Sequence, residues 1–277
     1  MNKLMVIFAH PDDETFSIGG TLAKIAADET EITLVVATRG EEGQIASTVD
    51  ADRSNLGEVR EDELKCAAQA LGVDRLHLLG YRDSGMQGDD ANEHPLAFIN
   101  APSEEVVAKL VALIREHRPD VVITFEPNGG YGHPDHIAIH QYARQAFFAA
   151  ADPTVYPQAG ESWEAARLYY TAIPRSFFDE MRQRMIEEGI DTSELDWLDS
   201  DQNRWTEEDI DLIVDVSESI ENKWAALECH QTQFGPDHLF RKLPWEVSRS
   251  LMAREYLTLA WPEEEPQGNL ESLFESI

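Results

Sequence analysis

The sequence predicts an α/β fold, a Rossmann-like and mostly parallel sheet with helices on both faces. Two observations predict it. Short apolar runs alternate with longer amphipathic stretches through most of the 277 residues, and polar motifs rich in histidine and aspartate follow two of the apolar runs. In open parallel sheets, ligands bind beyond the carboxyl ends of the strands, near the point where the strand order reverses.

Each expected strand is a short apolar run, and each expected helix repeats its apolar residues at helical spacing. The strands are expected at residues 4–9, 31–37, 75–79, 120–125, 168–173 and 210–215. The helices are expected at about residues 18–28, 55–71, 103–117, 135–150, 175–188 and 217–232. We expect a single domain over residues 1–240, with an acidic insertion or lid at 189–209 and a C-terminal extension at 241–277.

The charge of the chain limits its partners. Asp and Glu total 53 against 22 Lys and Arg, which gives a formal net charge of −31. Such a field repels nucleic acid and anionic membranes, so we expect neither as a partner. With no apolar run long enough to span a bilayer and no secretory leader, a cytoplasmic protein is expected. Cys66 and Cys229 form no CxxC pattern, so reduced thiols are expected rather than a disulfide. Self-association into a homo-oligomer stays open.

Two His-Pro-Asp motifs carry the chemistry. AHPDDE at residues 9–14 ends the first strand, and HPDH at residues 133–136 follows the fourth strand and a glycine-rich loop. Imidazole and carboxylate are common ligands of zinc and ferrous iron, and a catalytic site keeps a coordination position open. We expect His10, Asp13 and His136 to hold one divalent cation, because such a cation offsets the repulsion among adjacent carboxylates.

The remaining polar residues of the two motifs are candidates for proton transfer. Asp12 is expected to take a proton from the attacking water. His133, oriented by Asp135, is expected to stabilise an oxyanion and to protonate a leaving amine. His140 lies one turn beyond His136 and is a rival metal ligand, although packing is its more common role. A solvated surface cluster is the alternative interpretation, and two such motifs after parallel strands weigh against it.

The two motifs together resemble those of the PIG-L/LmbE-like family of metal-dependent N-deacetylases. TRGEEG at 38–43 and KWAALECHQTQ at 223–233 also resemble family segments. LGYRDSGM at 79–86 is similar to the branch that contains the mycothiol-pathway deacetylase and mycothiol conjugate amidase. The resemblance runs from about residue 3 to about 235, and it implies that residues 1–240 form an LmbE-like deacetylase domain.

The resemblance implies the same metal ligands, base and acid as the chemical argument. It places Tyr131 where the mycothiol-branch deacetylase has a tyrosine that polarises the substrate carbonyl. Structural interpretations remain open for the other matched positions, such as a helix-surface ion pair for Arg60 and a turn cap for Asp83. The residues expected to contact the substrate or face the site are Arg60, Asp83, Glu41, Met86 and His230.

These observations lead to one expected activity and to several rival activities. We expect a zinc-dependent hydrolase that removes the N-acetyl group from an N-acetylglucosamine-type amino-sugar derivative. Ferrous iron also suits two histidines and one carboxylate, which leaves an oxygenase as a rival class. An amidase for a larger thiol or sugar conjugate and a non-hydrolytic metal-bound scaffold also stay open. Nucleotide binding is disfavoured because the first strand–helix turn lacks GxGxxG.

Overall fold

One sheet organises the molecule. The computed structural model describes residues 1–193, 195, 205–263 and 270–275. Within these residues, a seven-stranded sheet has the order β3-β2-β1-β4-β5-β7-β6, and the five strands β1 to β5 run parallel to one another. This confirms the expected fold class. The strands are β1 Lys3–Phe8, β2 Glu31–Thr38, β3 Arg75–Tyr81, β4 Val121–Phe125, β5 Arg167–Thr171, β6 Leu212–Asp215 and β7 Arg254–Trp261.

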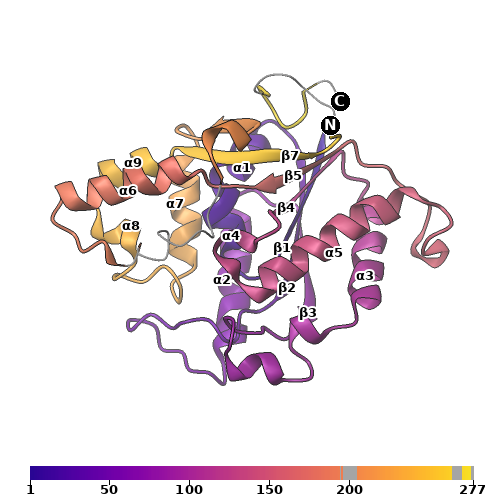
Figure 1. Ribbon diagram of the computed structural model, residues 1–277, viewed down its shortest axis with the longest axis horizontal. Helices are drawn as coiled ribbons and strands as arrows, with labels where there is room; N and C mark the ends of the chain where they lie inside the picture. The colour runs from indigo at the N-terminus through magenta and orange to yellow at the C-terminus, as the bar shows by residue number, and fades with distance from the viewer. Residues whose placement is uncertain (194, 196–204, 264–269, 276–277) are drawn as a thin grey trace.

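Helices cover both faces of the sheet (Figure 1). On one face α3 packs beside α5, and on the other α7 packs against α1 and α2. The helices are α1 Asp13–Ala27, α2 Leu56–Ala70, α3 Ser103–His117, α4 Gly129–Gly132, α5 Pro134–Ala151, α6 Arg175–Glu187, α7 Ile220–Cys229, α8 Leu239–Lys242 and α9 Trp245–Met252. Short 3-10 helices lie at Asp90–Glu93, Phe98–Asn100, Pro157–Ala159 and Glu207–Asp209.

The centre of the sheet brings the two histidine motifs together. β1 pairs with β2 on one side and with β4 on the other, so the strand order reverses between β1 and β4. These central strands are buried on both faces, and their side chains form the core with α1, α3 and α5. Because parallel neighbours end at the same edge, the loops that follow β1 and β4 lie side by side.

β7 was not expected from the sequence. All six expected strands are present, but Arg254–Trp261 forms a further strand between β5 and β6, antiparallel to both. It comes from the segment assigned to a C-terminal extension, so this part of the segment is integral to the sheet. Local pattern could not reveal it, because its two partners lie about 40 and 90 residues earlier in the chain.

A smaller helical lobe extends from the sheet beside β7 (Figure 1, left). Helices α6, α8 and α9 form it, and contacts among them bury a separate apolar cluster. Of the acidic segment 189–209, residues 194 and 196–204 lie outside the described residues, as do residues 264–269 and 276–277 of the tail. The lid therefore stays a prediction. The buried members of this cluster are Met181, Met185, Leu195, Leu243 and Leu251.

The expectation of two reduced thiols was wrong for this structure. Cys66 on α2 and Cys229 at the end of α7 form a disulfide, with their Cα atoms 5.7 Å apart. The two residues are 163 positions apart, and only the packing of α2 beside α7 brings them together. Spacing along the chain carries no signal for such a bond outside a dense cysteine framework.

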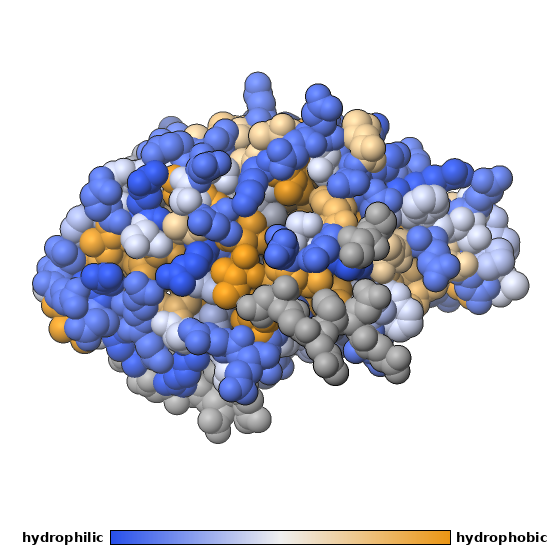
Figure 2. Space-filling view, turned by 90° about the horizontal axis from the view of Figure 1, so that it is seen from above, coloured by the Kyte–Doolittle hydropathy of each residue, from blue (hydrophilic) through white to orange (hydrophobic). Residues whose placement is uncertain are grey.

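The face of the molecule seen from above is largely polar (Figure 2). Figure 2 shows a largely hydrophilic face with apolar residues gathered near its middle. Among the described residues, no helix is both long enough and apolar enough to cross a membrane.

Candidate active site

The loop after β1 holds its carboxylates in an unusual conformation. Helix α1 begins at Asp13, earlier than the expected residue 18, and Asp12 is its N-cap. Asp12 has φ 98° and ψ −27°, a left-handed conformation that costs a non-glycine residue roughly 1–3 kcal/mol. Asp13 Oδ2 accepts the backbone N–H groups of Ala9 and His10, at 3.2 and 2.7 Å. These bonds fix the Asp13 side chain and leave Oδ1 free for another partner.

The loop after β4 orients His136. Glu126 accepts the N–H groups of Gly130 and Asn128 at 2.6 and 2.8 Å and so closes the loop. Gly129 has φ +66°, and a Cβ on it would lie 2.6 Å from the Cβ of His136, so only glycine fits. The carbonyl of Gly129 accepts a hydrogen bond from His136 Nδ1 at 3.1 Å. The proton of the neutral ring is therefore on Nδ1, and Nε2 is bare.

The geometry of His10 completes the argument for a cation. His10 Nε2 lies 3.0 Å from Asp83 Oδ1 and 3.3 Å from Asp135 Oδ2. A carboxylate can only accept, so Nε2 carries the proton of the neutral ring and Nδ1 is bare. That Nδ1 lies 3.0 Å from the bare Nε2 of His136. Two facing lone pairs repel each other, so either a proton or a metal cation must lie between them. Although burial opposes it, the carboxylates of Asp83 and Asp135 raise the pKa of His10, so a proton fills this place when no metal is bound.

Asp13 supplies a third donor at the same place. Its Oδ1 lies 3.3 Å from His136 Nε2, and its Oδ2 lies 3.7 Å from His10 Nδ1. Burial opposes ionisation of this carboxyl, but positive charge on the two imidazoles outweighs it and lowers the pKa of Asp13 to about 2, as a cation held between them would also do. Two imidazole nitrogens and one carboxylate oxygen fit a three-ligand metal site with room for a further ligand.

Two groups of possible ligands have His10 in common. The nearest ligand atoms of His10, His133 and His136 lie within 4.8 Å of one another, and so do those of His10, Asp83 and Asp135. The second group gathers around the protonated Nε2 of His10, which cannot bind a metal. We therefore assign its two carboxylates to orienting the His10 ring, as is common behind metal-bound histidines.

Arg60 faces Asp12 from α2. Its Nη2 lies 3.2 Å from Asp12 Oδ2 and also donates to the carbonyl of Pro11. Burial raises the pKa of Asp12 to about 6, although the Arg60 guanidinium opposes the shift. Gly40 makes room for this guanidinium, because a Cβ there would lie 2.1 Å from Nη1 of Arg60. The TRGEEG loop therefore supports the Asp12 carboxylate.

His133 is the N-cap of α5. Its Nδ1 accepts the backbone N–H of Asp135 at 3.1 Å, so the proton of the neutral ring is on Nε2. Burial and the neighbouring rings of His10 and His136 lower the pKa of His133 to about 3. The ring is therefore neutral near pH 7 and offers an N–H donor. Asp135 was expected to orient this ring. Its backbone N–H makes the bond to His133 Nδ1, while its carboxylate lies beside His10 and accepts the N–H of Ser84.

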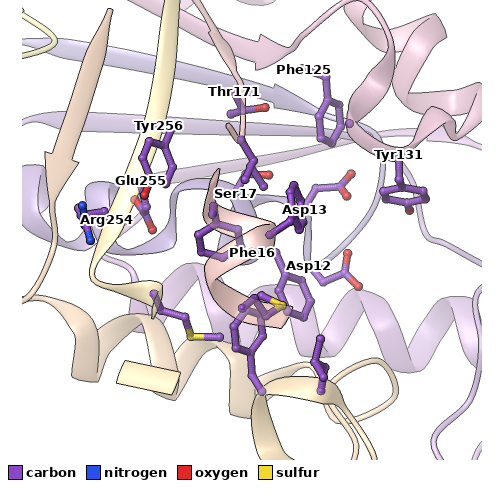
Figure 3. Close-up of a pocket in the computed structure, with 18 of the residues that line it drawn as sticks. Asp12, Asp13, Phe16, Ser17, Phe125, Tyr131, Thr171, Arg254, Glu255 and Tyr256 are labelled. Carbon is purple, nitrogen blue, oxygen red and sulfur yellow. The ribbon is translucent and has the colours of Figure 1, made fainter. Parts of the chain in front are cut away.

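A cavity of about 520 Å³ opens at these residues. In Figure 3 the carboxylates of Asp12 and Asp13 point toward the open space in front of Tyr131. Tyr131 is 47% exposed and sets its ring edge-on to His136, with centroids 5.0 Å apart. Leu195 and Trp205, two described residues of the acidic segment, also line the cavity. The wall toward the helical lobe is apolar and contains Phe16, Phe177, Phe178, Met181, Leu239, Phe240 and Met252.

The residues expected to contact the substrate lie in different places. Arg60 is 3% exposed and contacts Asp12. Asp83 is 2% exposed and contacts His10. Glu41 accepts the backbone N–H of Asp83. Met86 is 43% exposed and is not among the described residues that line the cavity.

The structure also places His230, His140 and Glu126. His230 is fully buried, with Nε2 2.8 Å from Glu14, so it faces the start of α1 rather than the cavity. His140 donates from Nδ1 to the carbonyl of Phe125 and packs on Tyr170, so the structure does not bring it to the other donors. Glu126, which shapes the second loop, follows a strand in EPNGG, and that position is its only sequence signal.

The fold and the donor set define a Rossmann-like α/β protein with a His/Asp cluster suited to a metal. A family model described as "PIG-L: GlcNAc-PI de-N-acetylase" matches residues 5–147. The chain is 39% identical over 268 residues to a 1D-myo-inositol 2-acetamido-2-deoxy-alpha-D-glucopyranoside deacetylase from Geodermatophilus obscurus, covering 93% of this chain and 91% of the relative. A deacetylase of the same name from Rhodococcus erythropolis is 40% identical over 271 residues, covering 93% and 90%. The chain belongs to the PIG-L family.

Solved structures confirm the fold. The N,N'-diacetylchitobiose deacetylase from Pyrococcus horikoshii has a TM-score of 0.66 at 21% identity, covering 93% of this chain and 83% of that one. The 4-carboxy-2-hydroxymuconate hydratase from Pseudomonas putida has a TM-score of 0.67 at 17% identity, covering 98% and 100%. Because a hydratase shares this fold, the fold alone does not identify the reaction.

Proposed function

We propose that the protein is a metal-dependent hydrolase that removes the N-acetyl group from an N-acetylglucosamine-type amino-sugar derivative. One observation carries the proposal. His10 Nδ1 and His136 Nε2 face each other at 3.0 Å with their other ring nitrogens already committed, and Asp13 Oδ1 lies beside them. Family membership and the deacetylase relatives support the choice of amide hydrolysis among the reactions that such a site can perform.

His10, Asp13 and His136 would hold the cation. We propose zinc, which accepts this donor set and needs no redox partner, and ferrous iron is the alternative. When bound, the cation supplies a Lewis acid for the amide carbonyl and lowers the pKa of the attacking water. Asp12 lines the same cavity as Asp13 and His136, and its carboxylate is not needed to bind the cation.

Proton transfer and stabilisation of the oxyanion are assigned to side chains of the protein. Asp12 accepts the proton of the attacking water, and Arg60 keeps its carboxylate directed toward the cavity. The Nε2–H of neutral His133 and the hydroxyl of Tyr131 donate to the developing oxyanion. Because the low pKa of His133 leaves that ring without a second proton, the proton held by Asp12 is the one available to the leaving amine. The products are acetate and a free amine.

The substrate remains to be chosen among related sugars. The two bacterial relatives described above are named for an inositol glycoside of N-acetylglucosamine, and we propose a substrate of this class. Sugar binding stays a prediction for Arg60, Asp83, Glu41 and Met86. In the structure, Arg60 contacts Asp12 and Asp83 contacts His10. The acidic composition supports the absence of nucleic acid and membrane partners.

A specific observation favours a second candidate. The apolar wall of the cavity, with Phe177, Phe178 and Phe240, offers more apolar surface than a free sugar needs. An amidase for a larger thiol or sugar conjugate would use this wall for the conjugated group. A non-hydrolytic scaffold would give Asp12 and His133 no chemical role. It is therefore less well supported than the deacetylase or the amidase.

Amine and acetate release separates these possibilities. N-acetylglucosamine, its inositol and malate glycosides, diacetylchitobiose and an S-alkylated thiol conjugate are incubated with the zinc-loaded protein. Release of acetate from a sugar supports the deacetylase, cleavage of the conjugate alone supports the amidase, and no turnover supports the scaffold. Chelation must abolish turnover, and added zinc must restore it. Asp12→Asn is expected to keep its zinc and lose about 10²–10⁴-fold in kcat.

Cytoplasmic location and self-association remain predictions. The bond between Cys66 and Cys229 bears on location, because disulfides persist mainly in oxidising compartments. Thiol labelling of the protein immediately after cell lysis, with and without prior reduction, measures whether the bond forms in the cell. Sedimentation at several protein concentrations measures the oligomeric state.

A further inference from the structure

Glu14, the third acid of AHPDDE, has no part in the proposed reaction. It is fully buried, and it is not among the described residues that line the cavity. A buried carboxylate next to two others is costly unless it is well paired. The contacts of Glu14 therefore indicate what it does.

One oxygen of Glu14 holds the backbone of Asp12. Glu14 Oε2 accepts the N–H of Asp12 at 3.0 Å. An aspartate at an N-cap usually accepts a helix N–H with its own carboxylate, but Asp12 makes no such bond. Its backbone is left-handed and its carboxylate is directed to the cavity and Arg60. Glu14 thus fastens the residue in a conformation that leaves the carboxylate free.

The other oxygen of Glu14 is held from a distant part of the chain. Glu14 Oε1 lies 2.8 Å from His230 Nε2 and also accepts the hydroxyl of Thr15. His230 follows α7 directly and is 216 residues away from Glu14 in sequence. Both side chains of the pair are 0% exposed, so water does not compete for these bonds. The pair therefore anchors the start of α1 to the end of α7.

We propose that Glu14 and His230 form a positioning pair that sets the aim of the Asp12 carboxylate. The pair acts through the Asp12 backbone and touches neither substrate nor cation. This assignment rests on the proposed function for its catalytic consequence, since Asp12 is the base in that proposal. It gives His230 a role behind the site in place of the expected role facing it.

Crystal structures test the pair independently of the reaction. In Glu14→Leu, Asp12 is expected to leave the left-handed region and its Oδ2 to separate from Arg60. In Glu14→Gln, the amide oxygen still accepts the Asp12 N–H, and the conformation should be kept. If Asp12 keeps its φ near 98° and its contact with Arg60 in Glu14→Leu, the proposal is wrong whatever the enzyme hydrolyses. Should Glu14→Leu not fold, His230→Leu gives the same readout.

Kinetics test the consequence on the substrate identified by the release assay. Glu14→Leu is expected to lower kcat by roughly 10–100-fold, the effect of a misplacement near 1 Å, with KM and bound zinc within two-fold of wild type. Glu14→Gln should recover most of the loss. The matched control is Glu63→Leu, which removes another buried acid whose partner, Thr232, lies two residues after His230. This control should lower stability and leave kcat within about two-fold.

A double-mutant cycle separates positioning from general support. If Glu14 acts through Asp12, adding Glu14→Leu to Asp12→Asn should lower kcat by less than three-fold further. Multiplicative losses would show that Glu14 acts independently of Asp12 and would overturn the proposal. If wild-type protein releases no acetate, the proposed function fails, and the crystallographic arm still decides on the pair.

Discussion

The buried ion pair between Lys223 on α7 and Glu255 on β7 gives the sharpest stability prediction. The ammonium Nζ lies 2.7 Å from Glu255 Oε1, and the two side chains are 4% and 1% exposed. Glu255 also accepts the N–H groups of Gly20 and Thr21 in α1, at 2.8 and 2.7 Å. Those two groups follow Ile18, where α1 departs from helical geometry. One carboxylate therefore connects the unexpected strand to two helices.

The magnitude follows from what each substitution leaves behind. Lys223→Met removes the cation but leaves Glu255 with its two backbone donors, so we expect a loss near the lower end of the range of about 3–5 kcal/mol for breaking a buried pair. Glu255→Leu leaves the Lys223 ammonium and the N–H groups of Gly20 and Thr21 without their acceptor. Each of the two unpaired N–H groups costs a further ~1–3 kcal/mol. That sum approaches the whole stability of an ordinary domain. We therefore expect Glu255→Leu to be largely unfolded.

Urea unfolding followed by circular dichroism measures these losses. The control is Lys65→Met, since Lys65 is 54% exposed and its ion pairs within the described residues are surface contacts to Glu61 and Asp62. That control should leave the free energy of unfolding almost unchanged, because exposed ion pairs contribute little to stability. A loss for Lys223→Met equal to that of the control, or a smaller loss for Glu255→Leu than for Lys223→Met, would refute the reasoning.

Three further predictions follow from other contacts. Gly40→Ala should lower kcat at least ten-fold with zinc retained, because its Cβ would lie 2.1 Å from Nη1 of Arg60; unchanged kinetics would contradict this cause. Cys229→Ser should lower the free energy of unfolding by about 2–5 kcal/mol in oxidising buffer and by much less in reducing buffer, as urea titrations would show. Burial and the nearby His77 lower the pKa of His117, so this side chain takes up a proton when the protein unfolds at acidic pH. The free energy of unfolding should therefore fall as pH drops below about 6.5, and His117→Gln should make this fall less steep.

The sequence predicted those parts of the site that depend on local pattern. β1 and β4 are apolar runs with polar motifs at their ends, and a parallel sheet places such ends at one edge. That argument brought His10, Asp13 and His136 together from residue order alone, and the structure does place them within contact distance. Whether they hold zinc in the cell stays a prediction for metal analysis.

The parts that failed depend on contacts between distant segments. β7 has no local signal that separates it from a tail, and only its pairing with β5 and β6 identifies it. The disulfide and the position of His230 both follow from α7 packing against α1 and α2. The contact between the Asp135 carboxylate and His10 was not predicted either, because spacing places Asp135 near both histidine motifs but does not show which ring its carboxylate meets.

Three consecutive acids at the end of a buried strand now have three separate explanations. Asp13 faces two imidazoles, Asp12 faces the guanidinium of Arg60, and Glu14 faces His230. Since adjacent carboxylates in a poorly hydrated site repel strongly, each needs a different cation or donor on a different side of the chain. A left-handed Asp12 provides this separation by turning the backbone between its neighbours. It follows that replacing each acid should change a different observable: metal content for Asp13, turnover with metal retained for Asp12, and the Asp12 backbone for Glu14.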